Sequence, residues 1–308
     1  MSGSRVLVTG ASGFIGRHLC RRLLDGGETV FGVSRSGEPA ERRMRWLGAD
    51  LTSMDGVRRV LKEAEPEVIY HLASHVKGAP DLELVLPTFA ANLQTTVNLL
   101  TGAAERGCRR IILSGSLVEP TGREPGAVPS SPYAAAKWAA ADYARMFRAL
   151  YGLPTVIARM FMVYGPAQPD ETKLVPYVIR SCQAGRAPRI TNGTRLVDWI
   201  YVDDVTRGLV ALAAAEGVDG QTVDLGSGTL VSIRQIVEAL VRAIGSRLEP
   251  VWGALPERPL EPVRQADVAE TERRIGWTPA VGLEDGLGRT VAWYDAHRDA
   301  PARQGTTA

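Results

Sequence analysis

Residues 6–16 read VLVTGASGFIG, and this stretch decides the fold. Its first four residues form a short apolar run typical of a buried parallel strand, and three glycines follow at intervals of three. An amphipathic helical pattern then continues to a Gly-Gly pair at 26–27. A strand, a glycine turn and a helix make a phosphate-binding turn, because the backbone can approach a pyrophosphate and the helix start offers free N–H groups. The stretch predicts a dinucleotide site, although its spacing is G-x-x-G-x-x-G and not the commoner G-x-G-x-x-G.

Strands and helices alternate along the first half of the chain. This alternation predicts an α/β fold with a Rossmann-type, doubly wound parallel sheet. Further strands are expected at 29–33, 46–52, 68–71, 110–113 and 155–159, and a long helical region at 82–105 is expected to break near Pro87. Ligands of such sheets lie beyond the C-terminal ends of the strands. The residues that fall at these ends are Gly10, Arg35, Asp50, Ala73 and Ser116.

The pattern loosens in the second half, which suggests two interleaved units. We expect residues 1–165 to form the cofactor-binding domain, with a contribution from segments near 195–225. Residues 166–297 are expected to form a smaller α/β domain that covers the substrate, and residues 298–308 a flexible tail.

Composition excludes several classes of function. The 36 basic and 34 acidic residues nearly balance, which argues against a nucleic-acid or membrane surface. No apolar stretch approaches the roughly 20 residues that span a bilayer, and no signal peptide is visible. The three cysteines lack metal or redox spacing, so we expect no metal, reduced thiols and a cytoplasmic location.

The end of the second strand bears on the choice of cofactor. An enzyme that selects NAD usually carries a carboxylate there for the ribose 2′-hydroxyl, but this chain has Ser34 followed by Arg35. A guanidinium can pair with a 2′-phosphate, and one charge-assisted bond favours NADP by about 10- to 150-fold. The sequence therefore predicts NADP(H), with NAD(H) possible if Arg35 is only an exposed loop residue.

Residues 130–137, SSPYAAAK, contain a candidate acid/base pair. Tyr133 and Lys137 are four residues apart in an alanine-rich helical run, so their side chains share one face. A nearby ammonium favours the phenolate and lowers the pKa of the phenol, which lets it exchange protons near neutral pH. On its own the pair is also compatible with two unrelated surface residues, and only the surrounding motifs favour catalysis.

Taken together, the motifs resemble those of the extended short-chain dehydrogenase/reductases, in the group of nucleotide-sugar epimerases, dehydratases and ketoreductases. The resemblance covers about residues 5–294 and rests on VLVTGASGFIG, HLAS, the serine strand, YAAAK, RMFMVYGP, DWIYVDDV and DLGSG. It implies a nicotinamide cofactor and a nucleoside-diphosphate sugar. Tyr133 would be the acid/base, Lys137 would hold the nicotinamide ribose, and Ser116 would hydrogen-bond the reacting oxygen. The cofactor contacts expected in all are Gly10, Ser12, Gly13, Phe14, Ile15, Gly16, Ser34, Arg35, Asp50, Leu51, Leu72, Ala73, Ser74, Asn92, Ser114, Tyr133, Lys137 and Phe161.

The chain departs from this family pattern in ways that concern the substrate. Dehydratases of the group carry an Asp-Glu pair directly after the catalytic hydroxyl residue, where this chain has Leu117 and Val118. Glu119 comes one residue too late, so 4,6-dehydration is disfavoured. Met162 stands where an asparagine is expected, and Val197 where an arginine is common. The candidate substrate contacts are His75, Lys77, Met162, Arg195 and Arg258.

Three functions remain open on the sequence alone. The leading one is NADPH-dependent reduction of a keto group, at C4, of a deoxysugar nucleotide. The alternative is a redox-neutral 4-epimerase that uses the same three residues, and the third is a non-catalytic protein that senses NADP. We also expect a homodimer. Neither the sugar nor the nucleotide base follows from the sequence.

Overall fold

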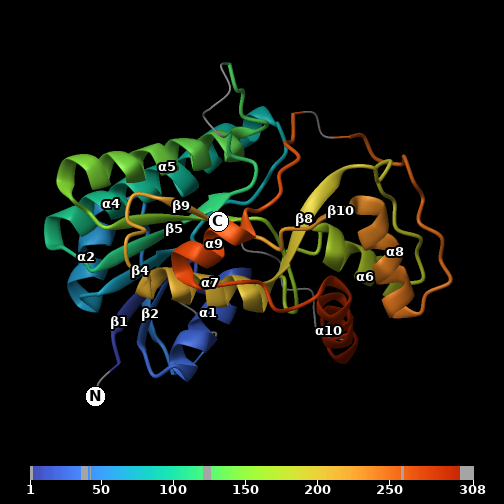
Figure 1. The fold of residues 1–308 in the computed structure, drawn as a ribbon, viewed down its shortest axis with the longest axis horizontal. Coiled ribbons are helices and arrows are strands. Elements are labelled where there is room, and N and C mark those ends of the chain that lie inside the picture. Colours follow the sequence, from blue (N-terminus) through green and yellow to red (C-terminus); the bar gives the residue numbers. More distant parts are fainter. Residues whose placement is uncertain (1–2, 36–40, 42, 121–125, 258–259, 299–308) are drawn as a thin grey trace.

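The computed structural model describes residues 3–35, 41, 43–120, 126–257 and 260–298 (Figure 1). A seven-stranded, entirely parallel sheet has the order β3-β2-β1-β4-β5-β6-β9. This is the Rossmann order with one strand added, and the predicted fold class is confirmed. Its strands are β1 (Arg5–Thr9), β2 (Thr29–Ser34), β3 (Arg45–Gly48), β4 (Val68–His71), β5 (Arg110–Ser116), β6 (Thr155–Met160) and β9 (Thr222–Leu225).

Helices cover both faces of this sheet, as Figure 1 shows. On one face α1 (Phe14–Asp25) packs against α7 (Val202–Ala214). On the other face α4 (Thr95–Arg106) packs between α2 (Met54–Ala64) and α5 (Pro132–Tyr151). Each face has its own apolar core, because buried parallel strands present apolar side chains to both sides.

The expected break near Pro87 does not occur. The chain passes from η1 (Leu82–Leu84) through α3 (Val85–Thr88) and the π-helical turn η2 (Phe89–Gln94) directly into α4. Pro87 is tolerated because it lies in the first turn of α3, where a missing N–H removes no helical bond. The irregularity instead lies in η2, which contains Asn92, and π-turns of this kind are frequent at functional sites.

A second, three-stranded sheet has the order β10-β8-β7. It consists of β7 (Met162–Tyr164), β8 (Leu196–Tyr201) and β10 (Leu230–Ser232), and the two short outer strands had not been predicted. The apolar core beside this sheet is filled from α6 (Leu174–Gln183), α8 (Ile233–Ile244) and α10 (Leu283–Ala296). Of the segment 195–225, β8 lies in this small sheet, whereas α7 and β9 lie with the large one.

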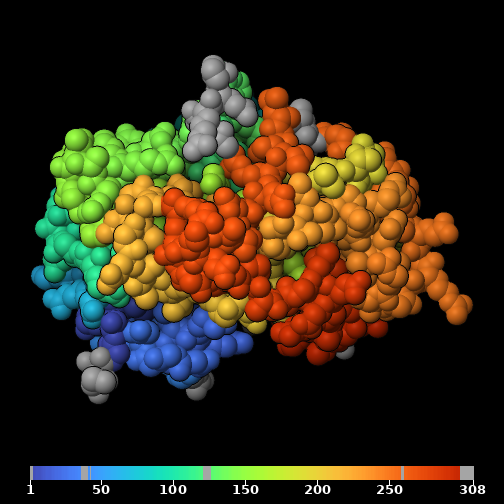
Figure 2. All heavy atoms as spheres, in the orientation of Figure 1, coloured from blue at the N-terminus to red at the C-terminus, as the bar shows by residue number. Residues whose placement is uncertain are grey.

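The C-terminal part of the chain returns to the large sheet. Helix α9 (Val268–Ile275) packs against β9, and Figure 2 shows it in orange-red on the surface of the first unit. Asp198 of β8 fixes the start of this return, because its fully buried carboxylate accepts hydrogen bonds from the N–H groups of Ser227, Gly228 and Ala266. In the described part of the chain no helix is long and apolar enough to cross a membrane.

Candidate active site

The glycine turn after β1 brings three segments of backbone close together. Gly10 has a φ of +67°, and a Cβ there would lie 2.7 Å from the backbone nitrogen of Ala73. A Cβ on Gly16 would lie 2.1 Å from the carbonyl oxygen of Gly10. Neither position therefore accepts a side chain without movement of the backbone. The Gly13 N–H donates to the Gly10 carbonyl at 2.9 Å and closes the turn.

The start of α1 fits the pyrophosphate of a dinucleotide. Gly13 is the N-cap residue, and no side chain caps the helix, so its first N–H groups remain available to an anion. Phe14 and Ile15 begin the helix and are half-buried, while the Ser12 carbonyl accepts from Arg17 at 2.8 Å. The predicted contacts of this turn thus lie together at one helix end.

The ends of β2 and β3 bring Arg35 near Asp50. Ser34 ends β2, and Arg35 follows it in an exposed position. The carboxylate of Asp50 accepts from both the N–H and the Oγ1 of Thr52, at 2.9 and 2.8 Å. These bonds, with a smaller contribution from the charge of Arg35, lower the pKa of Asp50. Leu51 is buried beside it. Most of the loop that follows Arg35 lies outside the described residues.

Asn92 holds the loop that follows β4. Its Oδ1 accepts from Ser74 Oγ at 3.2 Å and from the His75 N–H at 2.6 Å, and its Nδ2 donates to the His75 carbonyl at 3.2 Å. Asn92 is only 1% exposed, and these internal bonds engage both ends of its amide. Asn92 therefore shapes the 72–75 loop, which contains the predicted contacts Leu72 and Ala73.

His71 stabilises the same region as a neutral residue. Its Nδ1 lies 2.7 Å from Thr9 Oγ1 and its Nε2 lies 3.0 Å from Thr96 Oγ1. Thr96 donates its own proton to the Asn92 carbonyl at 2.6 Å, so the proton between Thr96 and His71 belongs to Nε2. Burial lowers the pKa of His71 to about 3. This pattern links β1, β4, η2 and α4 and engages both ring nitrogens of His71.

The Ser131 side chain positions the acid/base helix. Its Oγ accepts from the Ala134 N–H at 3.2 Å and caps α5, and Pro132 occupies the first helical position. Tyr133 and Lys137 lie on one face of α5, as their spacing predicted, and this face meets the end of β5. Lys137 Nζ lies 5.9 Å from the centre of the Tyr133 ring and donates to both the carbonyl and the Oγ of Ser114, at 2.8 Å each.

The protonation of Tyr133 differs from the expectation. Burial raises the pKa of Tyr133 to about 12, a side-chain hydrogen bond with Ser116 lowers it, and the charge of Glu119 raises it. Burial also lowers the pKa of Lys137 to about 8. In the protein without its cofactor the pKa of Tyr133 is thus raised, and the expectation that Lys137 depresses it stays a prediction for the cofactor-loaded protein.

Glu119 lies behind the site, not in it. Its side chain is buried and accepts a hydrogen bond from the Ser116 N–H. The positions directly after Ser116 are occupied by Leu117 and Val118, so no carboxylate stands where a dehydratase needs one. The sequence alone left the role of Glu119 open. The one hint it offered was a single carboxylate placed three residues after Ser116.

The candidate substrate contacts are less closely grouped. His75 points inward, where its Nδ1 lies 3.4 Å from Thr88 Oγ1, and Lys77 forms a 3.6 Å ion pair with Asp170. Arg195 forms an ion pair with Glu261, and its predicted contact with the substrate stays a prediction.

Two further predicted contacts lie where the chain enters the small sheet. Phe161 is buried in the core under α1 and α7, and its N–H donates to the Leu225 carbonyl at 3.1 Å. Met162, the next residue, packs against both that core and the core of the small sheet. Arg258 lies outside the described residues.

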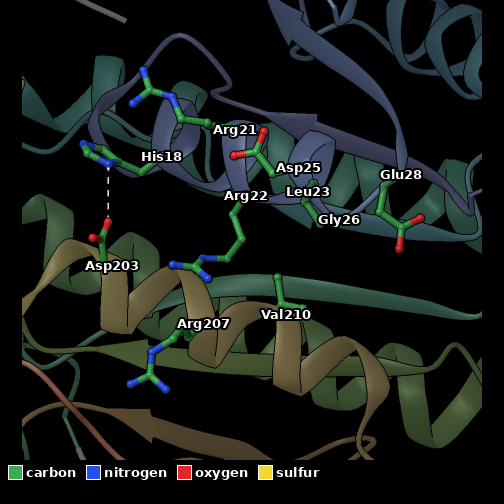
Figure 3. A pocket seen from close by; sticks show the side chains of 10 residues that line it. All are labelled: His18, Arg21, Arg22, Leu23, Asp25, Gly26, Glu28, Asp203, Arg207 and Val210. Carbon is green, nitrogen blue, oxygen red and sulfur yellow. Dashed lines mark ion pairs between the residues drawn. The ribbon is translucent and has the colours of Figure 1, made fainter.

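A groove of about 640 Å³ lies between α1 and α7, away from Tyr133 (Figure 3). Arg22 reaches from α1 toward α7 and donates to Thr206 Oγ1 at 2.9 Å, while His18 lies 3.7 Å from Asp203. Three arginines and three carboxylates line it, so it has no net preference for an anion or a cation. Burial lowers the pKa of His18 and keeps it neutral. The groove therefore belongs to the helix packing and not to the candidate site.

Comparison with known proteins gives consistent matches over the whole fold. A model of the NAD dependent epimerase/dehydratase family matches residues 6–226. The UDP-glucose 4-epimerase of Mycolicibacterium smegmatis is 33% identical and covers 94% of this chain and 98% of its own. The dTDP-glucose 4,6-dehydratase of Streptomyces griseus is 32% identical, with 96% and 95% covered.

Solved structures of epimerases share the fold of this chain. The UDP-glucose 4-epimerase of Thermotoga maritima, solved with UDP-glucose, superimposes with a TM-score of 0.87 at 25% identity and covers 96% of this chain and 99% of its own. The UDP-glucuronic acid 4-epimerase of Bacillus cereus, solved with UDP-glucuronic acid and NAD, gives a TM-score of 0.83 at 26% identity, with 94% and 99% covered.

Proposed function

Because the chain belongs to the NAD-dependent epimerase/dehydratase family, we propose that it inverts a nucleotide sugar at C4 without net oxidation or reduction. The observation that carries this proposal is one acid/base residue, Tyr133, beside Ser116, with Leu117 and Val118 in place of a carboxylate pair. The names of the relatives support the same choice. They favour the epimerase, which the sequence had placed second, over the ketoreductase, and the apolar pair argues against dehydration.

The residues of this chain would act on one hydroxyl. Tyr133, as phenolate, takes the proton of the sugar 4-hydroxyl while hydride leaves C4, and it returns that proton when hydride comes back to the other face of the ketone. Ser116 donates a hydrogen bond to the reacting oxygen, and Lys137 stabilises the phenolate through its positive charge. The nicotinamide, when bound, supplies the acceptor and donor of hydride.

The proposal extends to the cofactor. The Bacillus cereus neighbour was solved with NAD, and a redox-neutral enzyme has no need of an external pool of NADPH. Residues 1–165, together with α7 and β9, would hold it, and residues 166–297 would cover the sugar. The cytoplasmic location stays a prediction. It was based on the expectation of reduced thiols, and Cys20, Cys108 and Cys182 form no disulfide bond with one another.

A second candidate is the NADPH-dependent ketoreductase. The observation in its favour is Ser34 and the exposed Arg35 at the end of β2, where a carboxylate for the ribose would otherwise stand. Under this alternative Arg35→Ala should weaken NADPH binding by about 10- to 150-fold and leave NADH binding unchanged.

Cofactor retention separates the two candidates. We expect denaturation of the purified protein to release NAD in nearly stoichiometric amount, since an epimerase must keep its cofactor between the two half-reactions. The released nucleotide is identified and counted by chromatography. An empty protein that consumes NADPH in the presence of a 4-keto sugar nucleotide would decide for the ketoreductase.

We also propose a homodimer formed through α3, η2 and α5, which pack together. Leu82, Leu86 and Phe89 are 87%, 77% and 49% exposed on that side, an apolar surface unusual for a monomer. Leu86→Lys should convert the dimer to a monomer in sedimentation at micromolar concentration, while Leu196→Lys, an exposed position on β8, should not. A parent protein that sediments as a monomer would refute the proposal.

A further inference from the structure

Glu119 is an acidic residue placed unusually close behind the catalytic serine. It is 4% exposed, and its Oε1 accepts from the Ser116 N–H. A Cβ on Gly115 would lie 3.1 Å from this same oxygen and 2.7 Å from Ile157 Cγ2, so the carboxylate fills the space beneath the end of β5. A buried carboxylate loses hydration, and the Ser116 N–H supplies a hydrogen bond in place of water here.

The backbone of Glu119 is also held on both sides. Its N–H donates to the Ser116 carbonyl at 3.1 Å, which makes residues 116–119 a tight turn. Its own carbonyl accepts from Arg264 Nη2 at 2.7 Å. Arg264 belongs to the segment that returns from the small sheet to α9. The carboxylate therefore has a fixed position relative to Ser116.

Several charged groups face Glu119, and most already have a partner. The cations that act on it are Lys137 and Arg145 from α5 and Arg159 from β6. Arg145 pairs with Asp142, and Arg159 pairs with Asp224, each at 2.7 Å. Lys137 instead donates to Ser114. Glu119 is thus the carboxylate whose charge acts on Lys137, and the same charge acts on Tyr133.

We propose that Glu119 is a positioning residue of this site: its carboxylate fixes the backbone of Ser116 from behind and places a negative charge beside the Tyr133–Lys137 pair. The catalytic part of this inference rests on the function proposed above, whereas the electrostatic part concerns the protein and its bound cofactor alone. No contact of Glu119 with the substrate is implied.

The sign of the electrostatic effect follows from the charges. Burial raises the pKa of Glu119 to about 7, and the charge of Lys137 lowers it. Above that pH the carboxylate favours the ammonium form of Lys137 and disfavours the phenolate form of Tyr133. Removal of the negative charge should therefore let Tyr133 ionise at a lower pH.

The decisive experiment measures the ionisation of Tyr133 without any substrate. Tyrosinate absorbance near 295 nm is recorded against pH for the NAD-loaded protein and for its Tyr133→Phe counterpart, and their difference isolates Tyr133. Glu119→Gln keeps a hydrogen-bond acceptor for Ser116 but removes the charge. Its Tyr133 midpoint should fall by about one pH unit. Glu119→Met also removes the charge, and as an apolar side chain of similar size it should fold if the glutamine variant does not.

The rates of the same variants test the positioning of Ser116. With the sugar nucleotide that the parent turns over, Glu119→Met should lower kcat about tenfold more than Glu119→Gln at each variant's own optimum, with KM unchanged, because only the glutamine supplies an acceptor. An unchanged Tyr133 midpoint in both variants would overturn the electrostatic role, and equal rates would overturn the positioning role. If no sugar is turned over, the function proposed above fails, but the titration still decides the role of the charge.

Discussion

Tyr133→Phe is expected to lower kcat by about 10³-fold, within the range that general acid–base catalysis contributes. The substitution removes the hydroxyl that lies beside Ser116 and keeps the half-buried aromatic ring on α5. Binding of the cofactor and of the nucleotide part should change little, so KM should stay within a few-fold. The measurement is steady-state turnover of the sugar nucleotide, supported by titration of cofactor into the variant.

Tyr143→Phe is the matched control for this prediction. Tyr143 lies on the same helix and is 40% exposed. Removal of the Tyr143 hydroxyl should leave kcat and the free energy of unfolding unchanged. If Tyr133→Phe retained most of the activity of the parent, Tyr133 would not be the acid/base, and the catalytic assignment of the whole site would have to be abandoned.

Gly16→Ala is expected to impair both folding and cofactor binding. The new Cβ would lie 2.1 Å from the Gly10 carbonyl oxygen and 2.9 Å from the Ala11 Cα, and both neighbours are backbone atoms that cannot rotate away. Overpacking of this kind costs about 1–3 kcal/mol of stability. The glycine turn must also move away from the place where it would contact the pyrophosphate of the cofactor. NAD affinity should therefore fall by about 100-fold, which corresponds to about 2.7 kcal/mol.

Gly288→Ala provides the comparison. Gly288 lies on the exposed side of α10, and a Cβ there meets no atom within 4 Å. An alanine in a helix is more stable than a glycine by roughly 0.5–1 kcal/mol, so this variant should gain stability and bind NAD normally. Thermal unfolding with and without NAD measures both variants. Normal NAD binding by Gly16→Ala would contradict the assignment of the turn.

The fold of the first unit could be predicted because its signals are local. The spacing of Gly10, Gly13 and Gly16 after an apolar strand requires a particular turn, and the backbone contacts of Gly10 and Gly16 show why no other residue fits. The strands β7 and β10 were missed because each has only three residues, too few to show a period. Their partner β8 supplies the hydrogen bonds that define them.

The candidate site was predicted less completely, because side-chain direction depends on contacts distant in sequence. His75 lies in the loop after β4, as predicted. Asn92, however, binds the backbone of His75, and the side chain of His75 turns inward. Arg195 meets Glu261, which no local pattern indicates. The pKa of Tyr133 illustrates the same limit. Helical spacing correctly brings Lys137 near Tyr133, but burial, which depends on contacts distant in sequence, raises the pKa of Tyr133 and lowers that of Lys137.

The fate of the hydrogen on C4 tests the central claim most directly. A nucleotide sugar that carries deuterium at C4, beginning with UDP-glucose, is incubated with the purified protein and no added cofactor, and the product is examined by NMR and mass spectrometry. The account predicts the C4 epimer with the deuterium still on C4, because the same bound cofactor takes and returns it. An absolute requirement for NADPH, or a product whose C4 deuterium has been lost, would contradict the account.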